Sequence, residues 1–214
     1  MNGALLQSKI FAAYGKAAVF IGTSYSQYRP INAAGALNNL IGTLTAAFDT
    51  KPDFTFSKPN LYPAPIWYGL FNGAVVQPSD YFVGVGGTYF IAGMQPLLPA
   101  IAINCNRVLT ISAPQVQTGV GALGYGGSTT ANATQLVTGY PASVLQGTKG
   151  EKSVMQLPGD TRAPWWQVLL PALPGGIVLL NNYLMTDELG KRYKISSAEL
   201  SDLGWRITAA EMDS

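Results

Sequence analysis

The chain has 214 residues, of which 48% are hydrophobic and 11% are charged, and its formal net charge is +2. Ordinary soluble domains carry roughly a quarter charged residues, so the composition indicates a folded protein whose surface is either covered by other subunits or coated with neutral polar groups. The sequence has no histidine and one cysteine, which excludes Ser-His-Asp and Cys-His catalysis, the common His-containing zinc sites and an intrachain disulfide.

The first predicted element is a helix over residues 3–20. Apolar residues recur there at steps of three and four, which is typical of an amphipathic helix, and Gly22 predicts its end. These residues are Leu5, Leu6, Ile10, Ala13, Ala17 and Phe20. Lys9 and Lys16 interrupt the apolar N-terminus, so the pattern predicts neither a signal peptide nor a membrane-length run. A polar, extended link that contains Tyr28 and Arg29 follows, up to residue 39.

Residues 40–112 are predicted to form a first β module. The segment 40–48 fits either a helix or a strand, and its glycine and two threonines favour a strand. The apolar runs IWYGLF, DYFVGV, TYFIAGM and AIAINCNRVLTIS come next, and Gly86-Gly87 predicts a hairpin turn between the second and third of these. Residues 113–139 are rich in Gly, Ser, Thr and Ala and are interpreted as a connector.

Residues 140–214 repeat the plan of the first module. The phrase APIWYGLF at 64–71 returns as APWWQVLL at 163–170, and PASVLQGT corresponds to LTAAFDT. The expected pairs that follow are Tyr81 with Tyr183, Tyr89 with Tyr193, Ile91 with Ile195, and Trp205-Arg206 with Asn106-Arg107. Features matched in the same order predict an internal duplication. The alternative is that aromatic-rich strands look alike in any β protein.

The predicted fold class is therefore mainly β. Two duplicated antiparallel modules of about five strands, each closed as a small barrel or a sandwich, follow an N-terminal α-helix. The expected domain organisation is 1–39 for the helix and extended link, 40–112 for the first β module, 113–139 for the connector and 140–214 for the second β module.

The acidic residues Asp187, Glu188 and Asp202 are the densest carboxylate group and resemble the paired acids of a glycosidase. Asp187 and Glu188 precede Gly190 in a predicted hairpin turn, where acids are common, and residues 197–204 are read as a short helical turn or a loop. The glycine runs lack the lysine and helix of a phosphate loop. We therefore expect no enzyme activity and no catalytic, metal-binding or cofactor-binding residue, and no cofactor. Cys105 is read as a small buried hydrophobe.

Consecutive strand residues point to opposite faces, so Trp165 faces outward if Trp166 is the core equivalent of Trp67. An outward Trp165 is either a binding anchor or a side chain covered by a neighbouring loop. The candidate interface residues from the sequence are Leu6, Ile10, Tyr14, Tyr28, Arg29 and Trp165.

Four phrases of the chain resemble a family of uncharacterised proteins encoded among the virion genes of tailed bacteriophages and proteobacterial prophages. They are YGKAAVFIGTSYSQYRP, DYFVGVGGTYFIAGMQPLLPAIAINCNRVLTI, TGYPASVLQG and LMTDELGKRYKISSAELSDLGWRIT. The last module, with WWQVLLP, DELGKRYKIS and GWRITAAE, also resembles the β-barrel of phage head-completion, or head–tail stopper, proteins.

The resemblance implies a non-enzymatic structural subunit of a virion, assembled in the host cytoplasm as a ring-forming head–tail connector or short-tail protein. Its implied partners are copies of itself, contacted through the helix and sheet edges, and other phage tail or connector proteins. The chain has no basic cluster dense enough to indicate a DNA-binding groove. DNA is therefore expected only as passing cargo, and no membrane partner is expected. The alternative is a peripheral tail protein that attaches a fibre or binds a host surface glycan through exposed aromatics.

Overall fold

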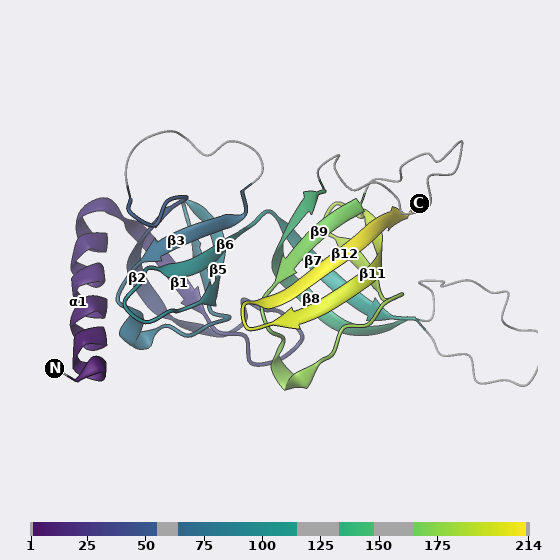
Figure 1. Cartoon of the computed structure of the whole chain (residues 1–214). Coiled ribbons are helices and arrows are strands. Elements are labelled where there is room, and N and C mark those ends of the chain that lie inside the picture. The colour runs from purple at the N-terminus through teal and green to yellow at the C-terminus, as the bar shows by residue number, and fades with distance from the viewer. Residues whose placement is uncertain (1, 55–63, 115–132, 148–164, 213–214) are drawn as a thin grey trace, which may run out of the picture.

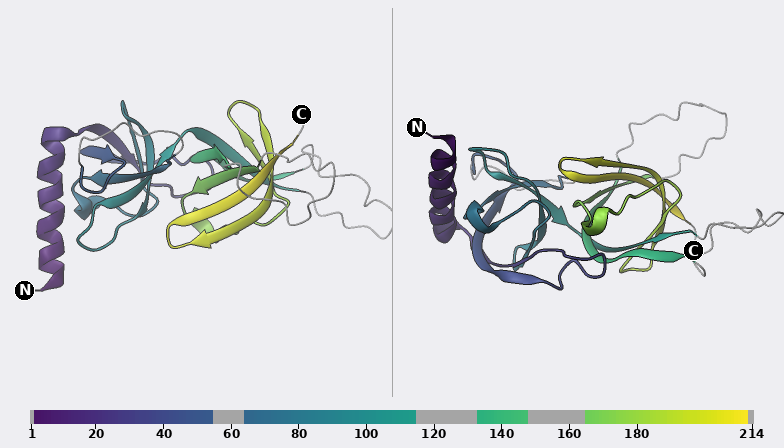
Figure 2. Two further views of the ribbon diagram at one scale, coloured as in Figure 1. Left: turned by 45° about the horizontal axis from the view of Figure 1, so that its top comes forward. Right: turned by 90° about the horizontal axis from the view of Figure 1, so that it is seen from below.

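The computed structural model describes residues 2–54, 64–114, 133–147 and 165–212. In this part of the chain, one helix precedes two closed antiparallel barrels of six strands each. The helix, the first barrel and the second barrel follow one another along the molecule in all three views (Figures 1 and 2). The structure confirms the mainly β class, the two modules and the N-terminal helix.

The helix α1 spans Gly3–Ile21, as its apolar periodicity predicts. The Asn2 side chain accepts a hydrogen bond from the backbone N–H of Ala4 at 3.1 Å and caps its first turn. At the other end the Gly22 N–H donates to the Ala18 carbonyl at 2.7 Å. A Cβ at Gly22 would collide with the backbone of Ala18 and Ala46, so glycine here lets the helix end lie directly against the barrel.

The first barrel contains strands β1 (Thr23–Tyr28), β2 (Leu40–Asp49), β3 (Ile66–Leu70), β4 (Tyr81–Gly84), β5 (Gly87–Gly93) and β6 (Ala100–Cys105). The order around the barrel is β1-β2-β3-β6-β5-β4. A short 3₁₀ helix, η1 (Gly73–Val75), lies between β3 and β4 in the sequence. The predicted hairpin at Gly86-Gly87 is confirmed, because it joins β4 to β5.

The second barrel contains strands β7 (Arg107–Ala113), β8 (Thr134–Gln146), β9 (Trp165–Leu170), β10 (Leu184–Asp187), β11 (Arg192–Ser201) and β12 (Gly204–Met212). The order is β10-β11-β12-β9-β8-β7. A 3₁₀ segment, η4 (Pro174–Gly176), again follows the third strand. Each strand therefore pairs with the same neighbours as the strand six places earlier in the chain.

Side-chain packing repeats as well as connectivity. The Trp67 ring meets the Tyr89 ring edge to face, with centroids 5.7 Å apart, and the Trp166 ring meets Tyr193 in the same way at 5.6 Å. In register, each tryptophan faces an alanine of the sixth strand of its barrel. The equivalence of Trp67 and Trp166, and that of Tyr89 and Tyr193, is therefore confirmed.

Irregularities of the backbone repeat too. A bulge interrupts the pairing of the last two strands directly after Ile91 in the first barrel and after Ile195 in the second. The residue two positions before the fourth strand has a positive φ in both barrels, 74° at Ser79 and 67° at Asn182. Because a bulge and a left-handed residue are local exceptions, their recurrence at matching places supports duplication more strongly than the shared strand number.

The module boundaries differ from those expected. Residues 23–28, expected in a link, form β1 of the first barrel, and residues 107–113, expected in the first module or the connector, form β7 of the second. Residues 134–139 of the expected connector begin β8, and 115–132 lie outside the described residues. Each module has six strands and not five. The first gains β1, which was expected in the N-terminal link, and the second gains β7, which was expected before it in the first module or the connector.

Two expected pairs are also corrected. Tyr81 pairs with Phe90 next to the Phe82–Tyr89 pair, and Leu184 pairs with Lys194 next to the pair that contains Tyr193. Leu184, and not Tyr183, is therefore the counterpart of Tyr81. The segment GWRITAA lies in β12, the counterpart of β6, so it does not match Asn106-Arg107 at the start of β7. Residues 197–204 were read as a short helical turn or a loop joining two strands. They form the β11–β12 hairpin, so the helical turn is wrong, and the connection between the two strands is the short turn at 202–203.

The two barrels meet through a short, well-bonded junction. Asn106, between β6 and β7, donates from Nδ2 to the Val144 carbonyl at 2.9 Å and accepts from the Val144 N–H at 2.7 Å. The Tyr81 hydroxyl donates to the Pro141 carbonyl at 2.8 Å. Phe90 and Ile103 of the first barrel belong to the same hydrophobic cluster as the interior of the second. The barrels therefore pack as one unit.

Candidate interaction surfaces

The outward face of α1 is apolar and exposed. Phe20 is 86% exposed and Val19 67%, and Leu5 and Ile21 are about half exposed. Lys9 and Lys16 are exposed on the same helix, whose sequence contains no acidic residue. Large exposed apolar groups that gather on one element mark a candidate interaction site, whereas single ones are ordinary. This face of α1 is the strongest such feature among the described residues.

The interface residues expected on this helix lie on its other side. Leu6, Ile10 and Tyr14 are half-buried, on the side where α1 contacts β2, β3 and η1. The Tyr14 hydroxyl donates to the Leu97 carbonyl at 3.3 Å. These three side chains lie on the side of the helix that faces its own barrel, whereas Leu5, Val19 and Phe20 are exposed.

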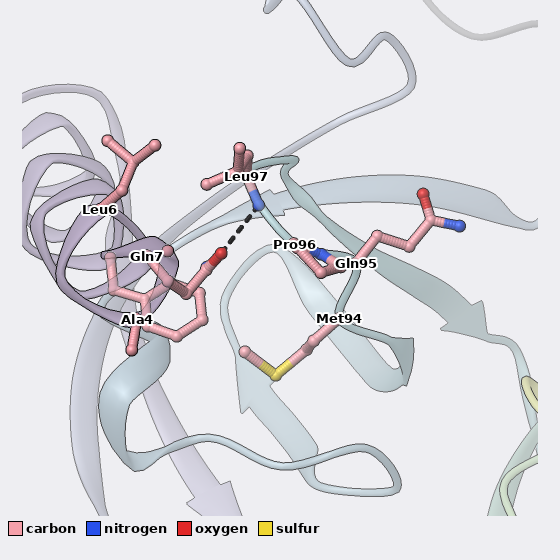
Figure 3. A pocket seen from close by; sticks show the side chains of 9 residues that line it. Ala4, Leu6, Gln7, Met94, Gln95, Pro96 and Leu97 are labelled. Carbon is pink, nitrogen blue, oxygen red and sulfur yellow. Dashed lines mark hydrogen bonds between the residues drawn. The ribbon is translucent and has the colours of Figure 1, made fainter. Parts of the chain in front are cut away.

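A cavity of about 420 Å³ lies between the N-terminal half of α1 and the loop that joins β5 to β6 (Figure 3). Its lining residues are Gly3, Ala4, Leu6, Gln7, Phe11, Met94, Gln95, Pro96 and Leu97. The Gln7 Oε1 accepts a hydrogen bond from the Leu97 N–H at 2.8 Å, while its buried Nε2 has no partner. The helix is therefore packed tightly at its C-terminal end and loosely at its N-terminal end.

Tyr28 and Arg29 are engaged within the first barrel. Tyr28 packs against the shared hydrophobic cluster. Arg29 donates from Nε and Nη2 to the two carboxylate oxygens of the fully buried Asp80, at 2.7 and 2.8 Å. Gln27, also buried, donates to Asp80 at 2.7 Å. The hydrogen bond to Asp80 raises the pKa of Arg29, against the opposing effect of desolvation.

Trp165 is half-buried at the start of β9. A Cβ on Gly147 would overlap the indole ring of Trp165, so this glycine lets the ring lie flat over the end of β8. Of the two interpretations of Trp165, the described residues favour the covered side chain over a free binding anchor.

A second hollow, of about 400 Å³, lies where the first barrel meets β9 and the β11–β12 hairpin. Its apolar lining includes Ile66, Ile103, Leu169 and Leu203, and Glu199, Ser201 and Arg206 lie among its polar residues. We call it the inter-barrel groove. It could not be found from the sequence, because its walls come from segments that are about a hundred residues apart in the chain.

The three acids considered as a catalytic group do not converge. Asp187 is buried and accepts from the backbone N–H groups of Leu189 and Lys191 and from the Tyr193 hydroxyl. Glu188 accepts from the Val108 N–H at 2.6 Å. Asp202 lies in the turn at the other end of β11. The turn interpretation of Asp187 and Glu188 is confirmed, and no group of three or more metal-ligating side chains occurs within the described ranges.

By length and mean hydropathy alone, α1 is apolar enough to cross a membrane, which the sequence expectation had excluded because of its two lysines. The packed helix of a soluble protein and a signal sequence share this length and hydropathy. In the structure α1 lies along the outside of the first barrel (Figure 1).

Comparisons with known proteins give no match: no family model, no curated protein and no solved structure is significantly similar to this chain. The phage resemblance therefore rests on the quoted phrases alone.

Proposed function

We propose that this chain is a non-enzymatic assembly subunit that associates with copies of itself, and that it serves as a ring-forming head–tail connector or short-tail component of a tailed-phage virion. The assembly role rests chiefly on one observation, the exposed apolar face of α1. An isolated soluble monomer normally avoids such a face because water contact with large apolar groups is unfavourable.

Two further features support self-assembly. The chain is poor in charge, as expected when part of its surface is covered. The two barrels share a hydrophobic cluster and so supply a rigid body on which a docking helix keeps a fixed orientation. The further step to a phage virion is supported by the resemblance of the four quoted phrases.

The test is mass photometry of the purified chain over a concentration series. Closed assemblies of one defined stoichiometry are expected, and a monomer at every concentration would overturn the proposal. Phe20→Asp is expected to reduce assembly, because it places a charge on the apolar face. Leu189→Asp is the matched control, because Leu189 is also exposed, at 62%, but lies in the β10–β11 turn of the second barrel, away from α1.

A further inference from the structure

We infer that the outward face of α1 docks into the inter-barrel groove of a second copy of this chain. This inference rests on the proposed self-assembly and names the surface that receives the helix. It starts from the charges of the two surfaces. The helix offers apolar side chains beside Lys9 and Lys16 and carries no carboxylate, so two such helices facing each other would bring like charges together.

The groove offers an apolar floor, and an acid lies beside it. Its floor is apolar, with Ile66 and Leu203 each nearly half exposed. Two charged residues line the groove, Glu199 and Arg206, and both are exposed. Asp202, also exposed, does not line it but lies next to the lining residue Leu203, in the turn of the β11–β12 hairpin. Glu199 is paired with Arg206 at 2.6 Å, so Asp202 is the acid that we assign to the incoming lysine.

The spacing on the helix fits this arrangement. Lys16 and Phe20 are four residues apart, and residues at this spacing are neighbours on one face of a helix. Phe20 can enter the apolar floor while Lys16 reaches the Asp202 carboxylate. The cavity of about 400 Å³ is within the size range of sites that enclose a small molecule, so it has room for one large side chain.

A helix cannot fill the groove of its own chain. The contacts of α1 with β2, β3 and η1 hold it at the end of the first barrel, whereas the groove lies at the opposite side of that barrel, next to the second (Figure 1). The contact therefore joins two different surfaces of two copies. Such a head-to-tail interface closes into a ring or extends as a filament, whereas self-complementary patches give dimers.

The charge pair is tested by reversal. Lys16→Glu and Asp202→Lys, each alone, are expected to raise the concentration needed for assembly about tenfold, and the two together in one chain to restore it. Lys191→Glu is the matched control for the lysine, because Lys191 lies in the β10–β11 turn and pairs with Glu211. Equal assembly of both single variants and the wild type would overturn the inference.

Disulfide trapping tests the contact itself. Chains with Phe20→Cys mixed with chains with Leu203→Cys are expected to give a covalent dimer under mild oxidation, and Phe20→Cys mixed with Leu189→Cys is not. A dimer formed by Phe20→Cys alone would replace the groove with a helix–helix contact. If the wild-type chain assembles but neither the cross-link nor the charge rescue is found, the inter-barrel groove is not the docking site, and the proposed self-assembly still stands. A wild-type chain that stays monomeric, or that floats with anionic vesicles as a monomer, refutes the proposed self-assembly as well.

Discussion

Trp67 and Trp166 occupy the same position in two barrels of one chain, each packed edge to face on a tyrosine of the fifth strand. The indole Nε1 of each is buried without a hydrogen-bond partner in the described structure. The same tryptophan–tyrosine packing, with the same buried N–H, therefore recurs at one position in both barrels.

Replacing either tryptophan by alanine is expected to lower the free energy of unfolding by about 3 kcal/mol, because it leaves a cavity beside the tyrosine. Since the barrels share a hydrophobic cluster, both variants are expected to shift one common transition in urea, followed by circular dichroism. Trp165→Ala is the control and should cost less. Two separate transitions, each moved by only one of the variants, would contradict the coupling of the barrels.

Asp80→Asn is expected to destabilise the chain by about 2–3 kcal/mol, because it leaves the Arg29 guanidinium and the buried Gln27 amide without their carboxylate. The loss of stability is smaller than for a fully buried ion pair, because the Arg29 side chain is 30% exposed to water. Thermal unfolding at neutral pH measures the change. Asp202→Asn, in an exposed turn, should have almost no effect, and equal shifts for the two variants would show that the Asp80 network adds little.

Alkaline pH is expected to unfold the protein through its buried tyrosines. Burial raises the pKa of Tyr89 and of Tyr140 to about 12, against about 10 in an unfolded chain. The folded state thus holds these protons more tightly, so their stabilisation is complete below pH of about 10 and is lost as the pH rises towards about 12. Ultraviolet titration of tyrosinate alongside circular dichroism would check this. Full ionisation of all tyrosines near pH 10 with the fold intact would contradict it.

Cys105, expected from the sequence to be buried, is half-buried. Burial still raises the pKa of its thiol well above the ordinary value, and the thiolate is the reactive form, so we expect it to resist alkylation in the native state. Mass spectrometry after iodoacetamide treatment should find it unmodified in buffer and modified in denaturant. Rapid native labelling would show that the end of β6 opens.

The sequence predicted the helix, the mainly β class and the duplication, because apolar periodicity and ordered aromatic phrases are local signals. It misplaced the boundary between the modules, since β6 and β7 are separated by Asn106 alone. Barrels that share a hydrophobic cluster need no flexible linker, and the Gly-rich segment lies between β7 and β8, within the second module.

The orientation of the helix could not be read from its sequence. Apolar residues occur all around α1, so the predicted stripe mixed exposed Leu5 and Phe20 with half-buried Leu6 and Ile10. The periodicity predicts a helix, but exposed apolar residues beyond one stripe leave open which side its own barrel covers.

The hydrogen bonds of Asp80 were missed for another reason. Arg29 and Asp80 are 51 residues apart, and a single acid beside an aromatic strand forms no recognisable sequence pattern.

Closure of both barrels leaves no unpaired strand edge among the described strands, contrary to the expectation that sheet edges contact neighbours. Main-chain hydrogen bonds do not depend on the side chains, so an open strand edge allows unrelated strands to add to a sheet and proteins to aggregate. A closed barrel avoids this risk at high protein concentration. Under the proposed self-assembly, contacts made through the described strands of the two barrels would have to use side chains. Natural selection could then change a partner by surface substitution while the backbone hydrogen bonds of these strands stay as they are.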